Sequence, residues 1–223
     1  TDYSDQLENA FSLSQYYDMA SYGQYHITSF VTQWYESPYM FSEMKQTNAV
    51  NESFRDEVFQ WLLATYPDMD WSRFDSDEDG FVDSLILINA GTSNDDFYDM
   101  TSFSGALRAN MGYTGEMAGT PQNPVVKDYI TINAGFLENN TLIHEYGHVL
   151  GLIDYYDTTY KGIDAVGIYD MQSGNYGDWN AYSKYAVGWI QPEVVSGLAK
   201  GESVEITIGS LVETGDAIVI PAA

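Results

Sequence analysis

Two of the three histidines in this chain lie four residues apart, at His144 and His148, and Glu145 stands between them. Residues four apart lie on the same face of an α-helix, so both imidazole rings can bind one metal ion. Glu145 lies beside that face, where it can reach a water on the metal rather than the metal itself. The spacing therefore predicts a helix that carries a metal centre.

The bounds of this helix can be read from its flanks. Residues 139–141 (Asn-Asn-Thr) offer cap chemistry before it, and apolar residues at 142–143 and 149–150 offer a packing face. Gly151 can take the left-handed conformation that ends a helix. We expect the helix over residues 141–150.

A catalytic zinc ion usually has three protein ligands and one open position, so a third ligand must come from beyond the helix. Asp154 is the natural candidate, because a reversal at Gly151 would turn it back toward the histidines. The alternatives in this acidic chain are Asp157, Asp164 and Asp170.

Residues 144–157, HEYGHVLGLIDYYD, resemble the HExxHxxGxxD signature of the immune inhibitor A family of secreted bacterial zinc metallopeptidases, which are metzincin-like. Further similar segments are residues 21–23, 74–83, 177–184 and 188–189. The resemblance covers most of residues 15–192. It implies an α+β fold in which a twisted mixed sheet accompanies the active-site helix. It also implies zinc ligands at His144, His148 and Asp154, with Glu145 as the general base.

The resemblance further implies a methionine in a tight turn beneath the metal, and the matching segment is residues 169–174. One register places Gln172 at the methionine position, and a shift by one residue places Met171 there. We favour Met171. Its structural alternative is an ordinary buried methionine.

A tyrosine could support the oxyanion of the reaction. Among nineteen tyrosines, Tyr176 is the first choice and Tyr155 the second, although packing is the more common role of a tyrosine in so aromatic a chain. We expect His26 to be a strand-face residue without a catalytic part.

A second cation site is predicted in residues 75–83, DSDEDGFVD. Acidic residues at alternating positions, a glycine at the sixth and an acid at the ninth follow the first part of an EF-hand calcium loop. The expected ligands are Asp75, Asp77, Asp79, Asp83 and the carbonyl of Phe81. The glutamate of the twelfth position is missing, since Ile86 stands there. A solvated acidic turn is the alternative, but crowded carboxylates repel one another unless a cation offsets them.

Charge and composition exclude several classes of function. Eight basic against 33 acidic residues give a net charge of -25, so nucleic acid and anionic membranes are poor partners. No run of eighteen apolar residues indicates a membrane span. The absence of cysteine excludes disulfides and thiol catalysis.

Periodicity predicts an alternation of helices and strands. The expected helices cover residues 5–20, 52–66, 104–110, 141–150 and 180–187, and the expected strands cover residues 25–35, 81–89, 129–134, 204–208 and 217–220. Residues 91–124 should otherwise form a long loop. We expect a peptidase domain over residues 1–192 and the start of an incomplete β-rich module over residues 193–223.

These features together predict a secreted zinc endopeptidase that cleaves extracellular proteins, with water activated by Glu145. We expect residues 129–134 to form a sheet edge that takes the substrate as an added strand. The alternatives are an inactive peptidase-like scaffold that serves in binding or adhesion, and zinc-dependent hydrolysis of a substrate other than a peptide. Glu145 favours an active enzyme, because a scaffold has no need for a base beside the metal.

Overall fold

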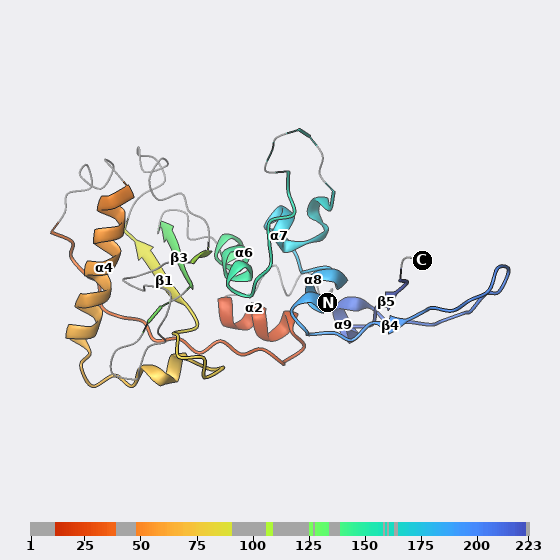
Figure 1. The fold of residues 1–223 in the computed structure, drawn as a ribbon, viewed down its shortest axis with the longest axis horizontal. Helices are drawn as coiled ribbons and strands as arrows, with labels where there is room; N and C mark the ends of the chain where they lie inside the picture. Colours follow the sequence, from red (N-terminus) through yellow and green to blue (C-terminus); the bar gives the residue numbers. More distant parts are fainter. Residues whose placement is uncertain are drawn as a thin grey trace. The chain divides into compact units, whose positions relative to one another are not determined.

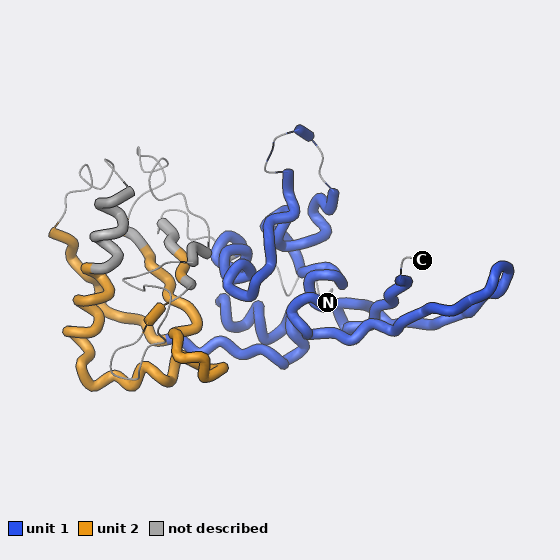
Figure 2. The backbone as a smooth tube through the Cα atoms, in the orientation of Figure 1, with its two compact units in different colours: residues 1–29, 138–223 blue, residues 30–137 orange. Residues whose placement is uncertain are grey.

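The computed structural model describes residues 12–38, 48–90, 106–108, 125–126, 128–133, 139–157, 159, 161–162 and 165–221. The chain forms two compact units (Figure 1, Figure 2). One consists of residues 1–29 and 138–223, and the other of residues 30–137. Within the part of the chain that the structure describes, no helix is both long enough and apolar enough to span a bilayer.

The unit of residues 30–137 combines a long helix with a small mixed sheet. Its elements are α4 (Asn48–Thr65), η1 (Trp71–Phe74), β1 (Leu85–Asn89), β2 (Ala106–Arg108) and β3 (Asp128–Asn133). The strand order is β1-β3-β2, with β1 parallel and β2 antiparallel to β3. The core of this unit consists of Phe59, Leu62, Trp71, Val82, Val126 and Tyr129. Helix α4 contributes Phe59 and Leu62 to that core, and β3 contributes Tyr129.

The structure confirms the helix predicted at residues 52–66, although α4 begins four residues earlier. It also confirms the strand predicted at residues 129–134, as β3. The strand predicted at residues 81–89 begins only at Leu85, because the preceding residues belong to the aspartate-rich loop. The short helix predicted at residues 104–110 is wrong, since residues 106–108 form β2.

The prediction that residues 129–134 form a sheet edge is wrong. Strand β3 is the central strand of its sheet, where Tyr129 and Ile130 pair with β1 on one side and with β2 on the other. A substrate strand cannot add to backbone groups that two neighbours already occupy. Chain order alone could not show this, because β2 comes from residues that were predicted to form a short helix within a long loop.

No strand forms at residues 25–35, contrary to the prediction. The segment leads from one unit to the other, and the described residues offer it no ladder partner. Val31 and Trp34 are 84% and 71% exposed, so the alternating pattern does not bury one face. Alternation of apolar and polar residues favours an extended backbone, but a β-strand also needs a neighbouring strand to which it can form hydrogen bonds.

The other unit is mainly helical and contains the predicted metal helix. Its elements are α2 (Leu13–Ala20), α6 (Asn139–Val149), η3 (Gly167–Tyr169), α7 (Met171–Gly174), α8 (Ala181–Ala186), β4 (Glu193–Val194), α9 (Leu211–Thr214) and β5 (Ile218–Val219). Aromatic side chains form much of its core. Tyr17 and Trp189 both pack against Trp179, with ring centroids 5.3 Å and 4.7 Å away.

Several predictions for this unit are confirmed. Helix α6 covers residues 141–149 and begins two residues before the predicted start. Helix α8 follows Asn180, whose side chain accepts from the backbone N–H groups of Tyr182 and Ser183. Helix α2 matches the second half of the helix predicted at residues 5–20, while residues 5–11 lie outside the described residues.

The C-terminal segment is only partly as predicted. Residues 217–220 contain β5, which pairs in parallel with β4. Residues 204–208 form no strand, because they lack a ladder partner among the described residues. A domain boundary between residues 192 and 193 stays a prediction.

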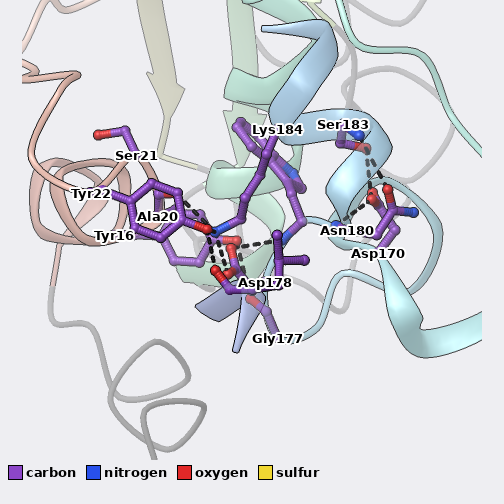
Figure 3. A network of polar contacts seen from close by, with 12 residues as sticks. Tyr16, Ala20, Ser21, Tyr22, Asp170, Gly177, Asp178, Asn180, Ser183 and Lys184 are labelled. Carbon is purple, nitrogen blue, oxygen red and sulfur yellow. Dashed lines mark hydrogen bonds and ion pairs between the residues drawn. The ribbon is translucent and has the colours of Figure 1, made fainter. Parts of the chain in front are cut away.

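A buried lysine ties α8 to α2 (Figure 3). Lys184 is fully buried, and its Nζ lies 2.5 Å from Asp178 Oδ2. The same ammonium group donates to the backbone oxygen of Ala20 at 2.9 Å and to the Tyr22 hydroxyl at 3.2 Å. Burial lowers the pKa of Lys184, and the Asp178 carboxylate opposes that shift. The charge is retained in the core because Asp178 and these oxygens surround it.

We predict that Lys184→Met lowers the free energy of unfolding by about 3–5 kcal/mol, since it leaves the Asp178 carboxylate buried without its cation. The double variant Lys184→Met/Asp178→Leu should recover much of that loss, because it removes both charges. Urea unfolding of the four proteins of this cycle measures the coupling. Additive effects would show that the two charges do not stabilise each other.

Candidate metal centre

Helix α6 presents both site histidines on one face, and the turn after it brings Asp154 to them. Asp154 Oδ1 lies 2.9 Å from His144 Nε2 and 3.3 Å from His148 Nε2. Each of the three residues offers one ligand atom, and these atoms lie within 4.8 Å of one another. Ligands held about 2.0–2.1 Å from a tetrahedral zinc ion are separated by roughly these distances.

The reversal at the end of α6 explains the position of Asp154. Gly151 has φ +89°, a left-handed conformation that costs little without a Cβ. Its N–H donates to His148 O at 2.9 Å, and the N–H of Leu152 donates to Gly147 O at 3.1 Å. These two bonds form the Schellman arrangement that ends many helices. The turn predicted from the glycine is therefore present.

Backbone carbonyls fix the direction of both imidazole rings. His144 Nδ1 lies 3.0 Å from Met171 O, and His148 Nδ1 lies 2.8 Å from Leu152 O. A carbonyl can only accept, so each Nδ1 must carry the proton. In a neutral ring, Nε2 is then the unprotonated nitrogen, which is the form that binds a metal.

Glu145 is buried beside this cluster. The residue is 3% exposed, and its Oε2 lacks a hydrogen-bond partner among the described residues. This oxygen lies 4.0 Å from His148 Nε2. Burial, with a smaller contribution from the Asp154 charge, raises the pKa of Glu145 to about 8. A carboxyl group that is shielded from solvent in this way is suited to exchanging a proton with a neighbouring group.

The segment predicted to form a turn beneath the metal contains α7, which contacts His144. Met171 is 1% exposed, and its carbonyl is the acceptor for His144. Gln172 is fully buried, and its amide nitrogen donates to His144 O at 3.2 Å. Both residues considered for the methionine position therefore contact His144. Met171 does so through its backbone, and Gln172 does so through its side chain.

Two of the competing aspartates are used elsewhere. Asp170 is fully buried; its carboxylate caps α7 at the N–H of Gln172 and accepts from Asn180 N and Ser183 Oγ. The Asp157 carboxylate accepts from residues 159 and 161 in its own turn. Asp164 lies outside the described residues. Among the aspartates that the structure describes, Asp154 is the one that lies beside both histidines.

The remaining candidates differ in their surroundings. Tyr176 is 46% exposed, and its role as an oxyanion donor stays a prediction. The Tyr155 hydroxyl lies 3.4 Å from Ser183 Oγ, within the polar network around Asp170. His26 lies 2.7 Å from an Asp18 carboxylate oxygen at the surface, outside the His144 cluster.

Two residues near the site were not predicted in their present roles. The ring of Tyr156 stacks on His144 with centroids 6.3 Å apart. The hydroxyl of Tyr17, on α2, donates to Ile143 O at 2.8 Å, next to the first histidine. The sequence does not indicate either contact. Each tyrosine lies in a pair of adjacent tyrosines, and such a pair is as common in a packed core as near a functional site.

The aspartate-rich loop lies in the unit of residues 30–137. Asp75, Asp77 and Asp83 each place a carboxylate oxygen within 4.8 Å of the others. Asp79 is not part of that group, and its carboxylate accepts from Phe81 N at 2.9 Å. Asp75 accepts from two backbone N–H groups, those of residues 79 and 80. The loop thus brings together three of the five predicted ligands.

Comparison with known proteins shows the family of this chain. A sequence model of the immune inhibitor A peptidase M6 catalytic domain matches residues 2–186. Two similar proteins are the pre-pro-metalloproteases PrtV of Vibrio cholerae serotype O1, from strains M66-2 and ATCC 39315 / El Tor Inaba N16961. Each is 26% identical over 224 residues, covering 86% of this chain.

The chain spans only 23% of the length of these two relatives. The family match, in contrast, covers most of the chain and includes the histidine pair and the turn beneath it. The chain therefore belongs to the immune inhibitor A peptidase M6 family and matches its catalytic domain, which is that of a metallopeptidase.

Proposed function

We propose that this chain is a zinc endopeptidase whose metal is held by His144, His148 and Asp154. The observation that supports this most directly is the approach of both Nε2 atoms to one carboxylate oxygen, Asp154 Oδ1. The family supplies the expectation of a metal, and two imidazoles with one carboxylate form a donor set that suits zinc.

The electrostatics of the cluster support a cation at this position. Since both Nδ1 atoms donate to carbonyls, neutral rings turn two nitrogen lone pairs toward the negative Asp154 oxygen. Protonation of both rings would relieve that repulsion. Burial, however, lowers the pKa of His144 and so disfavours its charged form. A divalent ion bound by all three donors satisfies them together.

When bound, the zinc ion would polarise the scissile carbonyl and make a water more acidic. Glu145 would take the proton of the attacking water and pass it to the leaving amine. Its burial keeps competing solvent away from the carboxylate, and its position next to His144 keeps it close to the ligand set without joining it. A nearby cation favours the charged carboxylate and so opposes the rise in pKa caused by burial.

We further propose that the enzyme acts outside the cell on proteins or peptides. The similar proteins are named pre-pro-metalloproteases, a term that describes secreted enzymes made with removable segments. The net charge of -25 suits a soluble enzyme that avoids nucleic acid. The retained and buried Glu145 favours this activity over an inactive scaffold.

We predict that Glu145→Gln lowers kcat for cleavage of an unfolded protein by about 10²–10⁴-fold, because the amide cannot accept the proton of water. The variant should unfold at the same temperature as the wild type or higher, since it replaces a buried carboxyl group, whose Oε2 has no hydrogen-bond partner among the described residues, with a neutral group of the same shape. Proteolysis assays and thermal unfolding measure the two effects.

A chelator should abolish the wild-type activity, and added zinc should restore it. Glu202→Gln is a matched control, because Glu202 is an exposed glutamate of the same unit outside the His144 cluster. Cleavage by Glu145→Gln at the wild-type rate would refute the role of the base. Cleavage that survives complete removal of metal would refute the metal mechanism itself.

We also propose that Asp75, Asp77 and Asp83 hold a structural calcium ion, with Asp79 and the carbonyl of Phe81 as further ligands. Oxygen donors at this spacing suit calcium. Gly80 has φ +88°, the conformation that a sharp turn at the sixth loop position requires. An ion here would stabilise the loop just before β1 by offsetting the repulsion among the carboxylates.

Calcium should raise the thermal unfolding midpoint, with a stabilisation of about 2.7 kcal/mol at a concentration 100 times its Kd. Asp77→Asn should weaken this effect by removing a ligand charge. Glu78→Gln is the matched control, because it removes one charge from the same loop outside the predicted ligand set. An equal calcium response in both variants, or none in the wild type, would contradict the proposal.

A further inference from the structure

We infer that Gln172 is a positioning residue that holds His144 and the Asp154 segment in the arrangement that binds the metal. This inference rests on the proposed function, since it concerns the same three ligands. Gln172 lies in α7, so it reaches both segments from outside the ligand helix. Its side chain contacts the backbone of His144, and its own backbone carbonyl contacts the residue that follows Asp154.

The side chain of Gln172 bridges α6 and a core tryptophan. Its Nε2 donates to His144 O at 3.2 Å, and its Oε1 accepts from Trp179 Nε1 at 3.2 Å. Gln172 and Trp179 are 0% and 1% exposed. Water therefore cannot replace either bond easily, and loss of the amide would leave the buried Trp179 N–H without its acceptor.

The backbone of Gln172 fixes two further groups of the site. Its N–H donates to Asp170 Oδ1 at 2.8 Å, which anchors the peptide unit whose carbonyl oxygen, that of Met171, meets His144 Nδ1. Its own carbonyl accepts from Tyr155 N at 3.0 Å, directly after Asp154 in the chain. Gln172 thus contacts both the turn that orients His144 and the residue that follows Asp154.

Gly147 provides the space for this side chain. A Cβ at position 147 would lie 2.4 Å from Gln172 Oε1 and 2.8 Å from its amide carbon. A glycine inside a helix costs about 1 kcal/mol relative to alanine, so its presence in α6 has a packing reason here. Gly147 lies between the two histidines in the chain, and its replacement would displace the Gln172 amide from its contact with His144 O.

The first test is Gln172→Met, which keeps the length and approximate volume of the side chain and removes both amide hydrogen bonds. We expect zinc affinity, measured by competition with a chromophoric chelator, to fall 10–100-fold, as is typical when a group that orients a metal ligand is lost. The visible spectrum of the cobalt-substituted protein should change as well, because α7, whose Met171 carbonyl orients the His144 ring, is no longer tied to α6 by the Gln172 amide.

Ile190→Ala is the control for a general loss of stability. Ile190 is 4% exposed in the same unit, and it takes no part in the hydrogen bonds of Gln172. This variant should lower the urea midpoint but keep the zinc affinity and the cobalt spectrum of the wild type. A merely structural role of Gln172 would give both variants the same pattern.

The second test uses the close approach of Gly147 and does not depend on Gln172→Met folding. Gly147→Ala should weaken zinc binding in the wild type by displacing Gln172. In a Gln172→Ala background the same change should cost much less, because the space is already free. Equal losses of zinc affinity in both backgrounds would overturn the inference.

The outcomes separate this inference from the proposed function. Wild-type zinc affinity in Gln172→Met would overturn the role of Gln172 and leave the zinc site intact. Failure of the wild-type protein to bind zinc at all would refute the proposed metal site, and the inference with it. Activity is a secondary readout, for which we expect a fall in kcat with little change in KM.

Discussion

The hydrogen bonds from two ring nitrogens to backbone carbonyls are the interaction on which the rest of the site depends. They assign the proton of His144 and of His148 to Nδ1, and they point both Nε2 atoms at Asp154. One carbonyl belongs to the turn that ends α6, and the other to α7. Each ring is therefore held by a hydrogen bond to a backbone carbonyl of a neighbouring turn.

The scaffold around α6 explains why those turns stay in place. Tyr17 on α2 donates to Ile143 O, and Tyr16 next to it donates to Gly177 O. The buried Lys184 joins the end of α2 to α8 through Ala20 O, and its charge is balanced by Asp178. A core this rich in polar contacts is costly unless every group is paired, so it favours one arrangement over looser alternatives.

Much of the candidate metal site could be predicted from the sequence because its signals are local. The histidine spacing requires one helix face, and Gly151 marks the turn that returns Asp154. The part played by Gln172 could not be predicted, because it depends on a contact between α6 and α7 with no fixed spacing. A glycine within a helix, such as Gly147, indicates that another group packs closely against it, but it does not indicate that this group is Gln172.

The same distinction applies to the fold. Helices α4, α6 and α8 follow from local periodicity and capping, and they were predicted within a few residues. Strand pairing joins residues far apart in the chain. Residues 129–134 were therefore recognised as a strand but not as the centre of the sheet, and residues 25–35 were predicted as a strand that has no partner in the described part of the chain.

The measurement that tests the central claim most directly is an anomalous difference map, recorded at the zinc edge from crystals of the zinc-loaded protein. The account predicts one peak about 2.0–2.1 Å from Nε2 of His144, Nε2 of His148 and a carboxylate oxygen of Asp154. A zinc peak next to His26 or Asp170 instead, or no peak at the His144 cluster, would contradict it.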